Sequence, residues 1–213
     1  MKVELERYLP NEIEKRSMEL ISQELGARVL PEENADIIKR VIHTTADFDY
    51  AENLVFSPGA AEAGVAALKK GAVIVTDTNM ACAGVNKAAC EKLGVRVVCY
   101  MAEAEIAEAA KRENTTRAAA SMERAAKLPG PVVFAVGNAP TALIRLYELM
   151  EDGLLDPALV IGVPVGFVNV VESKELILTA KAPYIVARGR KGGSNVAAAI
   201  CNALLYRAVG RKL

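Results

Sequence analysis

Short runs of β-branched and apolar residues alternate with longer amphipathic segments over most of this chain. The apolar runs, each of which predicts a buried β-strand, occupy residues 72–76, 95–100, 131–136, 158–161 and 184–187. The amphipathic segments predict helices over residues 88–93, 103–127 with a break near 114–115, 139–151, 171–179 and 194–208. Strands that are apolar throughout indicate a parallel sheet covered by helices on both faces.

We therefore expect an α/β protein with a flavodoxin-like three-layer α/β/α fold. Its five-stranded parallel sheet should have the order 2-1-3-4-5, with strands numbered along the chain. The first 70 residues lie outside the regular alternation and predict extra N-terminal helices over about 10–26, 31–43 and 59–69. No linker-like segment or internal repeat divides the chain, so we expect a single domain over residues 1–213.

Composition narrows the class of protein. Lysine plus arginine equals aspartate plus glutamate at 26 each, so no basic excess favours a nucleic acid or a membrane surface as partner. No apolar run reaches the ~20 residues of a membrane span, and residues 1–7 lack the apolar core of a secretory signal. The four cysteines form no CxxC pair, and one histidine cannot complete a zinc set, so we expect a cytoplasmic protein without a metal site.

Polar and glycine residues follow four of the five predicted strands. These segments are residues 76–79, 137–138, 162–166 and 188–194. Because ligands bind beyond the carboxyl ends of parallel strands, the four segments together predict one binding site. Glycine and proline also turn chains at strand ends for purely structural reasons, an interpretation that suits a single loop better than four.

The last of these segments combines basic residues with glycines. Its members are Arg188, Gly189, Arg190, Lys191, Gly192, Gly193 and Ser194. We expect the glycines to let the backbone approach a ligand, Ser194 to cap the following helix, and the basic helix N-terminus to attract an anion. The segment lacks the P-loop and GxGxxG patterns, so nucleotide phosphate is weakly supported and carboxylates fit equally well. A solvated basic turn is the alternative interpretation.

His43 is the only histidine in the chain. An imidazole, with an unperturbed pKa of roughly 6.5, can both accept and donate a proton near neutrality, which makes His43 the first candidate for proton chemistry. It follows the apolar pair Val41-Ile42, so the alternative is a buried structural histidine.

Several motifs occur in a fixed order along the chain. They are Glu12-Ile13-Glu14-Lys15-Arg16-Ser17, VIHTTADFDY at 41–50, Thr76-Asp77-Thr78-Asn79-Met80, Thr116-Arg117, the segments 137–143 and 162–167, Glu172-Ser173-Lys174-Glu175 and 189–194. In this order they resemble the precorrin-8X methylmutase family, which includes the cobalt-precorrin-8 methylmutases of cobalamin biosynthesis. The resemblance runs from about residue 8 to the C-terminus.

The resemblance implies an isomerase that moves a methyl group from C-11 to C-12 of cobalt-precorrin-8 or precorrin-8X, giving cobyrinate or hydrogenobyrinate. The transfer is intramolecular, so no cofactor is expected, and the implied partners are the corrinoid substrate and a second copy in a homodimer with sites near the interface. His43 is the implied catalytic residue, which protonates or hydrogen-bonds the ring system. The implied substrate-binding residues are Arg16, Ser17, Thr44, Asp77, Thr116, Arg117, Asn138, Gly166, Arg188, Gly192, Gly193 and Ser194, with Asp77 in a supporting role.

Two other functions remain open at this point. One is a non-catalytic tetrapyrrole carrier on the same fold, and the other is a flavodoxin-like protein that binds a nucleotide or flavin. The sequence does not distinguish a cobalt-containing from a metal-free substrate, because the corrinoid itself would hold the metal, although the overall resemblance favours the cobalt form.

Overall fold

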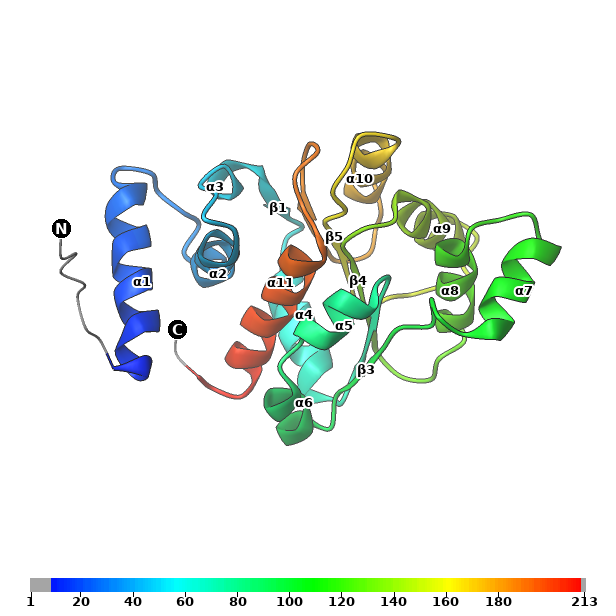
Figure 1. Ribbon diagram of the computed structural model, residues 1–213, viewed down its shortest axis with the longest axis horizontal. Coiled ribbons are helices and arrows are strands. Elements are labelled where there is room, and N and C mark those ends of the chain that lie inside the picture. The colour runs from blue at the N-terminus through cyan, green and yellow to red at the C-terminus, as the bar shows by residue number, and fades with distance from the viewer. Residues whose placement is uncertain (1–8, 212–213) are drawn as a thin grey trace, which may run out of the picture.

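The computed structural model describes residues 9–211, which form an α/β fold around a six-stranded mixed sheet (Figure 1). The strands are β1 Leu54–Phe56, β2 Val73–Thr76, β3 Arg96–Val98, β4 Val132–Val136, β5 Leu159–Gly162 and β6 Tyr184–Ala187. Their order in the sheet is β1-β6-β5-β4-β2-β3. The five predicted strands all form and pair in parallel, and their predicted relative order is confirmed.

The expectation of a five-stranded, wholly parallel sheet is wrong at one edge. There β1 pairs antiparallel with β6, with Leu54 opposite Ala187. The ladder continues past the strand, since the Arg188 N–H donates to the Asn53 carbonyl at 2.8 Å. Three residues are too few to show a strand period in the sequence, and only pairing with the exposed edge of β6 makes this segment a strand.

The helices agree with the predicted pattern and add two short elements to it. They are α1 Pro10–Leu25, α2 Ala35–Thr45, α3 Tyr50–Asn53, α4 Ala60–Lys69, α5 Asn79–Gly84, α6 Lys87–Leu93, α7 Ala104–Arg112, α8 Arg117–Ala125, α9 Pro140–Glu151, α10 Val170–Leu178 and α11 Ser194–Ala208. The break expected near residues 114–115 separates α7 from α8. The sequence did not predict α3 and α5, because one or two turns carry too little periodicity.

Both faces of the sheet are buried, each against its own set of helices. Ile74 of β2 belongs to a core cluster that includes residues of α2, α4 and α11. Its neighbours Val73 and Val75 belong to a second cluster that includes residues of α8, α9 and α10. Because alternate strand residues point to opposite faces, this division explains why the strands are apolar at every position.

The N-terminal helices extend the fold at one end. In Figure 1, α1 lies beyond α2, whereas α7 and α8 lie at the opposite end of the molecule.

Within residues 9–211, no helix is long and apolar enough to cross a membrane. Residues 1–8 and 212–213 of the expected domain lie outside the described residues.

Candidate functional site at the carboxyl edge of the sheet

The loops that follow β2, β4, β5 and β6 contact one another along one edge of the sheet. The hydroxyl groups of Thr78 and Ser194 form a hydrogen bond of 2.7 Å, which joins the loop after β2 to the start of α11. The Gly193 N–H donates to the Val163 carbonyl at 2.8 Å, which joins the loop after β6 to the loop after β5. The predicted convergence of these segments is therefore confirmed.

Asp77 holds the loop after β4 from beneath. Its side chain is fully buried, and its Oδ1 accepts a hydrogen bond from the Gly137 N–H at 2.8 Å. Its Oδ2 accepts from the N–H groups of Asn138 at 2.7 Å and Ala139 at 2.6 Å. Burial raises the pKa of Asp77, while the three N–H donors act in the opposite direction. Asp77 thus positions Asn138 at the surface and is itself enclosed.

Neither Asn138 nor Ser194 is a helix N-cap, and the expectation that Ser194 caps the helix after it is therefore wrong. Helix α9 has Ala139 as its N-cap, with Pro140 in the first turn, and Asn138 is exposed one residue earlier. Helix α11 has Gly193 as its N-cap, and Ser194 is its first residue. Both positions instead make tertiary contacts, because Asp77 accepts from the Asn138 and Ala139 N–H groups and the Ser194 hydroxyl bonds to that of Thr78.

Gly192 of the last loop is required by close packing against the loop after β5. A Cβ atom on Gly192 would lie 2.1 Å from the Val163 carbonyl oxygen, a distance that excludes every other residue type. The Gly166 N–H donates to the Arg190 carbonyl at 3.1 Å, and Gly166 itself has φ +148°. Gly166 and Gly192 therefore join the loops after β5 and β6, whereas the sequence suggested that the glycines of the last loop approach a ligand.

Most of the basic charge on the last loop is already paired. Arg188 makes a bidentate contact with Glu175, at 3.0 Å from Nε and 2.8 Å from Nη2. The Lys191 ammonium lies 2.6 Å from a carboxylate oxygen of both Asp47 and Asp49. Hydrogen bonding to Lys191 lowers the pKa of Asp47, and the two carboxylates raise the pKa of Lys191. This contact also ties the last loop to the segment that follows α2.

Arg190 differs from its two basic neighbours. It is exposed and forms no ion pair within residues 9–211. Its guanidinium lies 5.4 Å from the centre of the Phe167 ring, whose side chain is 82% exposed on the loop after β5. Arg190 is therefore the side chain of this loop whose charge is most available to a ligand.

His43 lies in the last turn of α2 and is exposed, so its interpretation as a buried structural histidine is wrong. Its neighbour Thr44 lines a cavity of about 250 Å³ between α2, α5 and α11. The other residues around this cavity are Arg40, Gly84, Asn195, Ala198, Ala199, Asn202 and Tyr206. The cavity places the His43 end of α2 beside the first turns of α11, and so beside the strand-end loops.

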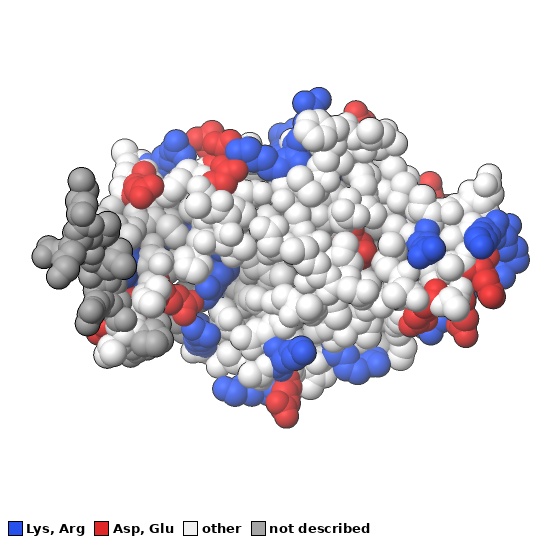
Figure 2. All heavy atoms as spheres, viewed as in Figure 1, with Lys and Arg blue, Asp and Glu red and all other residues white. Residues whose placement is uncertain are grey.

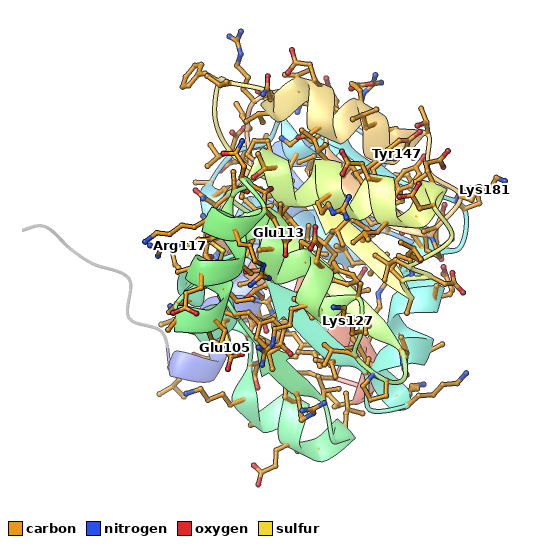
Figure 3. The ribbon with its side chains drawn as sticks, turned by 90° about the vertical axis from the view of Figure 1, so that its right-hand side faces the viewer. Glu105, Glu113, Arg117, Lys127, Tyr147 and Lys181 are labelled. Carbon is orange, nitrogen blue, oxygen red and sulfur yellow. The ribbon has the colours of Figure 1, made fainter. Side chains whose placement is uncertain are left out.

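Thr116 and Arg117 begin α8 at the other side of the loops. The Thr116 hydroxyl donates to the Thr141 hydroxyl at 2.9 Å, which joins the start of α8 to the first turn of α9 next to Asn138. Arg117 projects from this point into solvent (Figure 3) and forms no ion pair within the described part of the chain. With Lys111 and other residues of the α7–α8 segment, it lines a hollow of about 720 Å³.

The face between α2 and α8 carries little charge. Figure 2 shows that the surface over α5 and α11 is largely free of Lys, Arg, Asp and Glu, which gather around its rim. Met80 on α5 is 71% exposed. This uncharged surface has an exposed apolar side chain and lies between α2, whose last turn carries His43, and α8, whose first turn carries Arg117. Such a surface suits a broad, mostly apolar ligand or a second protein surface.

Arg16 and Ser17 are not brought to the strand-end loops or to α8 within one chain, although α1 packs against α2, where Arg40 pairs with Glu14. Both lie on α1, where the Ser17 hydroxyl donates to the Ile13 carbonyl at 2.8 Å and Arg16 lies 3.5 Å from Glu19. Figure 1 places α1 at the end of the molecule opposite α8. Within a single chain, Arg16 and Ser17 are therefore distant from the other predicted binding residues at the strand-end loops and α8.

Lys174 is the residue of this region that the sequence argument missed. It is fully buried in α10, and its ammonium donates to the carbonyls of Gly189 and Lys191 at 2.8 Å each. The charged run around it resembles a solvated helix face. The available signal was the helical spacing of Val170, Lys174 and Ile177, which places the lysine on the apolar side of α10.

Comparison with known proteins agrees with this geometry. The sequence model of the precorrin-8X methylmutase family matches residues 12–207. The cobalt-precorrin-8 methylmutase of Priestia megaterium is 44% identical over 92% of this chain and 87% of its own length. The precorrin-8X methylmutase of Pseudomonas aeruginosa is 40% identical over 90% of this chain and 93% of its own length. The solved precorrin-8X methylmutase of Thermus thermophilus has a TM-score of 0.86 at 38% identity, covering 94% of this chain and 99% of that one.

Proposed function

This chain belongs to the precorrin-8X methylmutase family of cobalamin biosynthesis, and we propose that it moves a methyl group from C-11 to C-12 of its corrinoid precursor. It is a methylmutase, an intramolecular transferase of the isomerase class. Because the methyl group stays on one molecule, the protein has to hold the macrocycle and direct a proton, and no cofactor is required. The alternatives of a carrier and of a nucleotide-binding protein are less well supported than this reaction.

The observation that carries the mechanism is that His43 is exposed in the last turn of α2, the helix beside the uncharged face. An exposed imidazole can reach a ligand, which a buried one cannot. We assign His43 as the residue that protonates or hydrogen-bonds the ring system while the methyl group moves. The hydroxyl of Thr44, which donates to the Arg40 carbonyl at 3.0 Å, lies beside it as a binding contact.

Substrate carboxylates are assigned to the rim of the same face. Arg117 and Arg190 supply guanidinium groups without an acidic partner in residues 9–211, and the start of α11 supplies N–H groups. Asn138 and Thr116 offer polar contacts between them. The other proposed binding residues act by shaping the loops. Buried Asp77 and the glycines Gly166, Gly192 and Gly193 set the loop conformations. Ser194 holds the start of α11 through Thr78, and Arg188 holds the last loop through its pair with Glu175.

We further propose a homodimer in which Arg16 and Ser17 of one chain serve the site of the other. Two observations support this. Within one chain, α1 lies far from α8 (Figure 1), and α1 exposes the apolar side chains of Ile13 and Leu20. A second copy would cover these side chains and bring the polar residues of α1 to the rim of a site.

Two finer assignments complete the proposal. The five parallel strands with helices on both faces make up a flavodoxin-like three-layer unit within a single domain, to which β1 and the N-terminal helices are added. The substrate is assigned as the cobalt form, because the relative from Priestia megaterium carries that name and is somewhat more similar than the one from Pseudomonas aeruginosa.

The test is His43→Ala, with His43→Gln as a variant that keeps a hydrogen bond but offers no proton. Because His43 is exposed, both variants should melt within a few degrees of the wild type. Single-turnover rates with cobalt-loaded and metal-free substrate should fall by ~10²–10⁴-fold, while binding followed by absorbance changes little. Near-wild-type turnover by folded His43→Ala would refute the catalytic assignment. A wild type that binds the corrinoid without converting either form would favour the carrier.

A further inference from the structure

Lys174 is a buried cation without an acidic partner. Its ammonium lies beneath the β6–α11 loop and donates to the Gly189 and Lys191 carbonyls, while no carboxylate lies within ion-pair distance in residues 9–211. Burying an unpaired ammonium is costly, and most proteins avoid it. A lysine kept in such a position at the edge of a binding site therefore suggests a function for its charge.

The charges around this loop show what Lys174 adds. The cations are Arg188, Arg190, Lys191 and Lys174, and the carboxylates that contact them are Glu175, Asp47 and Asp49. Four cations thus face three carboxylates, and without Lys174 the two signs would balance. The excess positive charge of the loop depends on a residue that no ligand can touch directly.

The same ammonium sets the conformation of the loop. By drawing the Gly189 and Lys191 carbonyls inward, it leaves the side chain of Arg190 directed outward next to Phe167. It also supports the loop where the Gly166 N–H donates to the Arg190 carbonyl and the Gly193 N–H donates to the Val163 carbonyl.

We propose that Lys174 is a positioning residue for substrate binding, whose buried ammonium both holds the β6–α11 loop and provides the positive charge with which that loop attracts a substrate carboxylate. This inference deepens the proposed function and rests on it. Lys174 acts through the loop and does not contact the corrinoid.

Titration of Lys174 gives the proposal its signature. Burial lowers its pKa to about 8. The charged or titratable side chains on the surrounding segments are Glu172 and Glu175 of α10, Arg145, Tyr147, Glu148 and Glu151 of α9, Tyr184 of β6, Asp47, Asp49 and Tyr50 near α3, and Arg188, Arg190 and Lys191 of the loop. None of them contributes to this shift, which burial alone causes. As the pH rises through about 8, the neutral amine keeps N–H donors for the carbonyls but loses the charge, so affinity should fall.

The experiment measures affinity for cobyrinate, a stable polycarboxylate product, by absorbance titration between pH 6.5 and 9.5. Affinity of the wild type should fall about tenfold over this range, the effect of losing one nearby buried charge. Lys174→Met should bind about tenfold more weakly at pH 7 and show a flat profile, whereas Lys174→Arg, which stays charged, should bind well at every pH. Lys181→Met is the matched control, because Lys181 projects into solvent (Figure 3), and it should match the wild type.

Amide exchange of Gly166 and Gly193 tests the positioning half, and it should be severalfold faster in Lys174→Met than in the wild type. A flat pH profile in the wild type would overturn the inference whether or not the variants fold. An unchanged profile in Lys174→Met would overturn it as well, by leaving Lys174 a purely structural role. A wild type that binds neither substrate nor product would contradict the proposed function instead.

Discussion

Replacing the carboxylate of Asp77 is the strongest test of which contacts hold the loops of this site in place. It is fully buried and accepts three backbone hydrogen bonds, from Gly137, Asn138 and Ala139, at 2.6–2.8 Å. Hydrogen bonds to a charged group contribute ~1.5–3 kcal/mol each, and relief of the buried charge offsets part of the loss when the carboxylate is removed. We expect Asp77→Ala to lower the free energy of unfolding by about 3–5 kcal/mol.

Asp77→Asn is the sharper perturbation because it keeps the shape of the side chain. The amide retains one acceptor oxygen, but its NH₂ group faces a backbone N–H group. We therefore expect the free energy of unfolding to fall by about 2–3 kcal/mol. For a chain of this size that corresponds to a fall in melting temperature of roughly 5–10 °C. Displacement of Asn138 and the start of α9 should also reduce turnover, by up to ~10²-fold for a shift of about 1 Å.

Urea unfolding and single-turnover kinetics on the same preparations measure both effects. Asp156→Asn is the matched control, because Asp156 is exposed in the loop before β5 and should tolerate the change. If Asp77→Asn melts and turns over like the wild type, the three N–H bonds do not hold the loop, and the account of this edge of the sheet is wrong.

Three further outcomes follow from the structure. Gly192→Ala should destabilise the protein by at least ~1–3 kcal/mol in urea unfolding, because the new Cβ would meet the Val163 carbonyl. Gly59→Ala should cost less, because Gly59 has open space and only an unfavourable φ, and equal losses of stability would contradict the packing argument. Arg117→Ala should weaken corrinoid binding about tenfold at low salt and less at high salt, without changing the melting temperature. The control Lys127→Ala should change neither affinity nor melting temperature, and unchanged affinity in Arg117→Ala would show that Arg117 is only a solvated side chain. Equilibrium sedimentation should give a dimer at micromolar concentration and a monomer for Ile13→Glu; a monomeric wild type would refute the shared site.

The parallel part of the sheet was predictable because its information is local. Each strand is a short apolar run between helical segments, and right-handed crossovers leave few orders for five such strands. The short strand β1 was not predictable, because Leu54–Phe56 becomes a strand only by pairing with the edge of β6. Family motifs indicated the reaction and His43, but no motif indicates that an imidazole is exposed.

The sequence by itself determined the order of the strands, the edge at which the loops meet and the family of the chain, since these depend on local periodicity and on motifs. Only the tertiary structure decided what each loop residue does. In the folded chain, Asp77 and Gly192 support the loops, and Arg188 and Lys191 pair with carboxylates. Arg190 and Arg117 form no ion pair within residues 9–211, so their charges are available to a ligand. The tertiary structure also placed Lys174 beneath the last loop. Charge pairing and burial depend on residues that are distant in the sequence, and a sequence pattern does not record which of them meet.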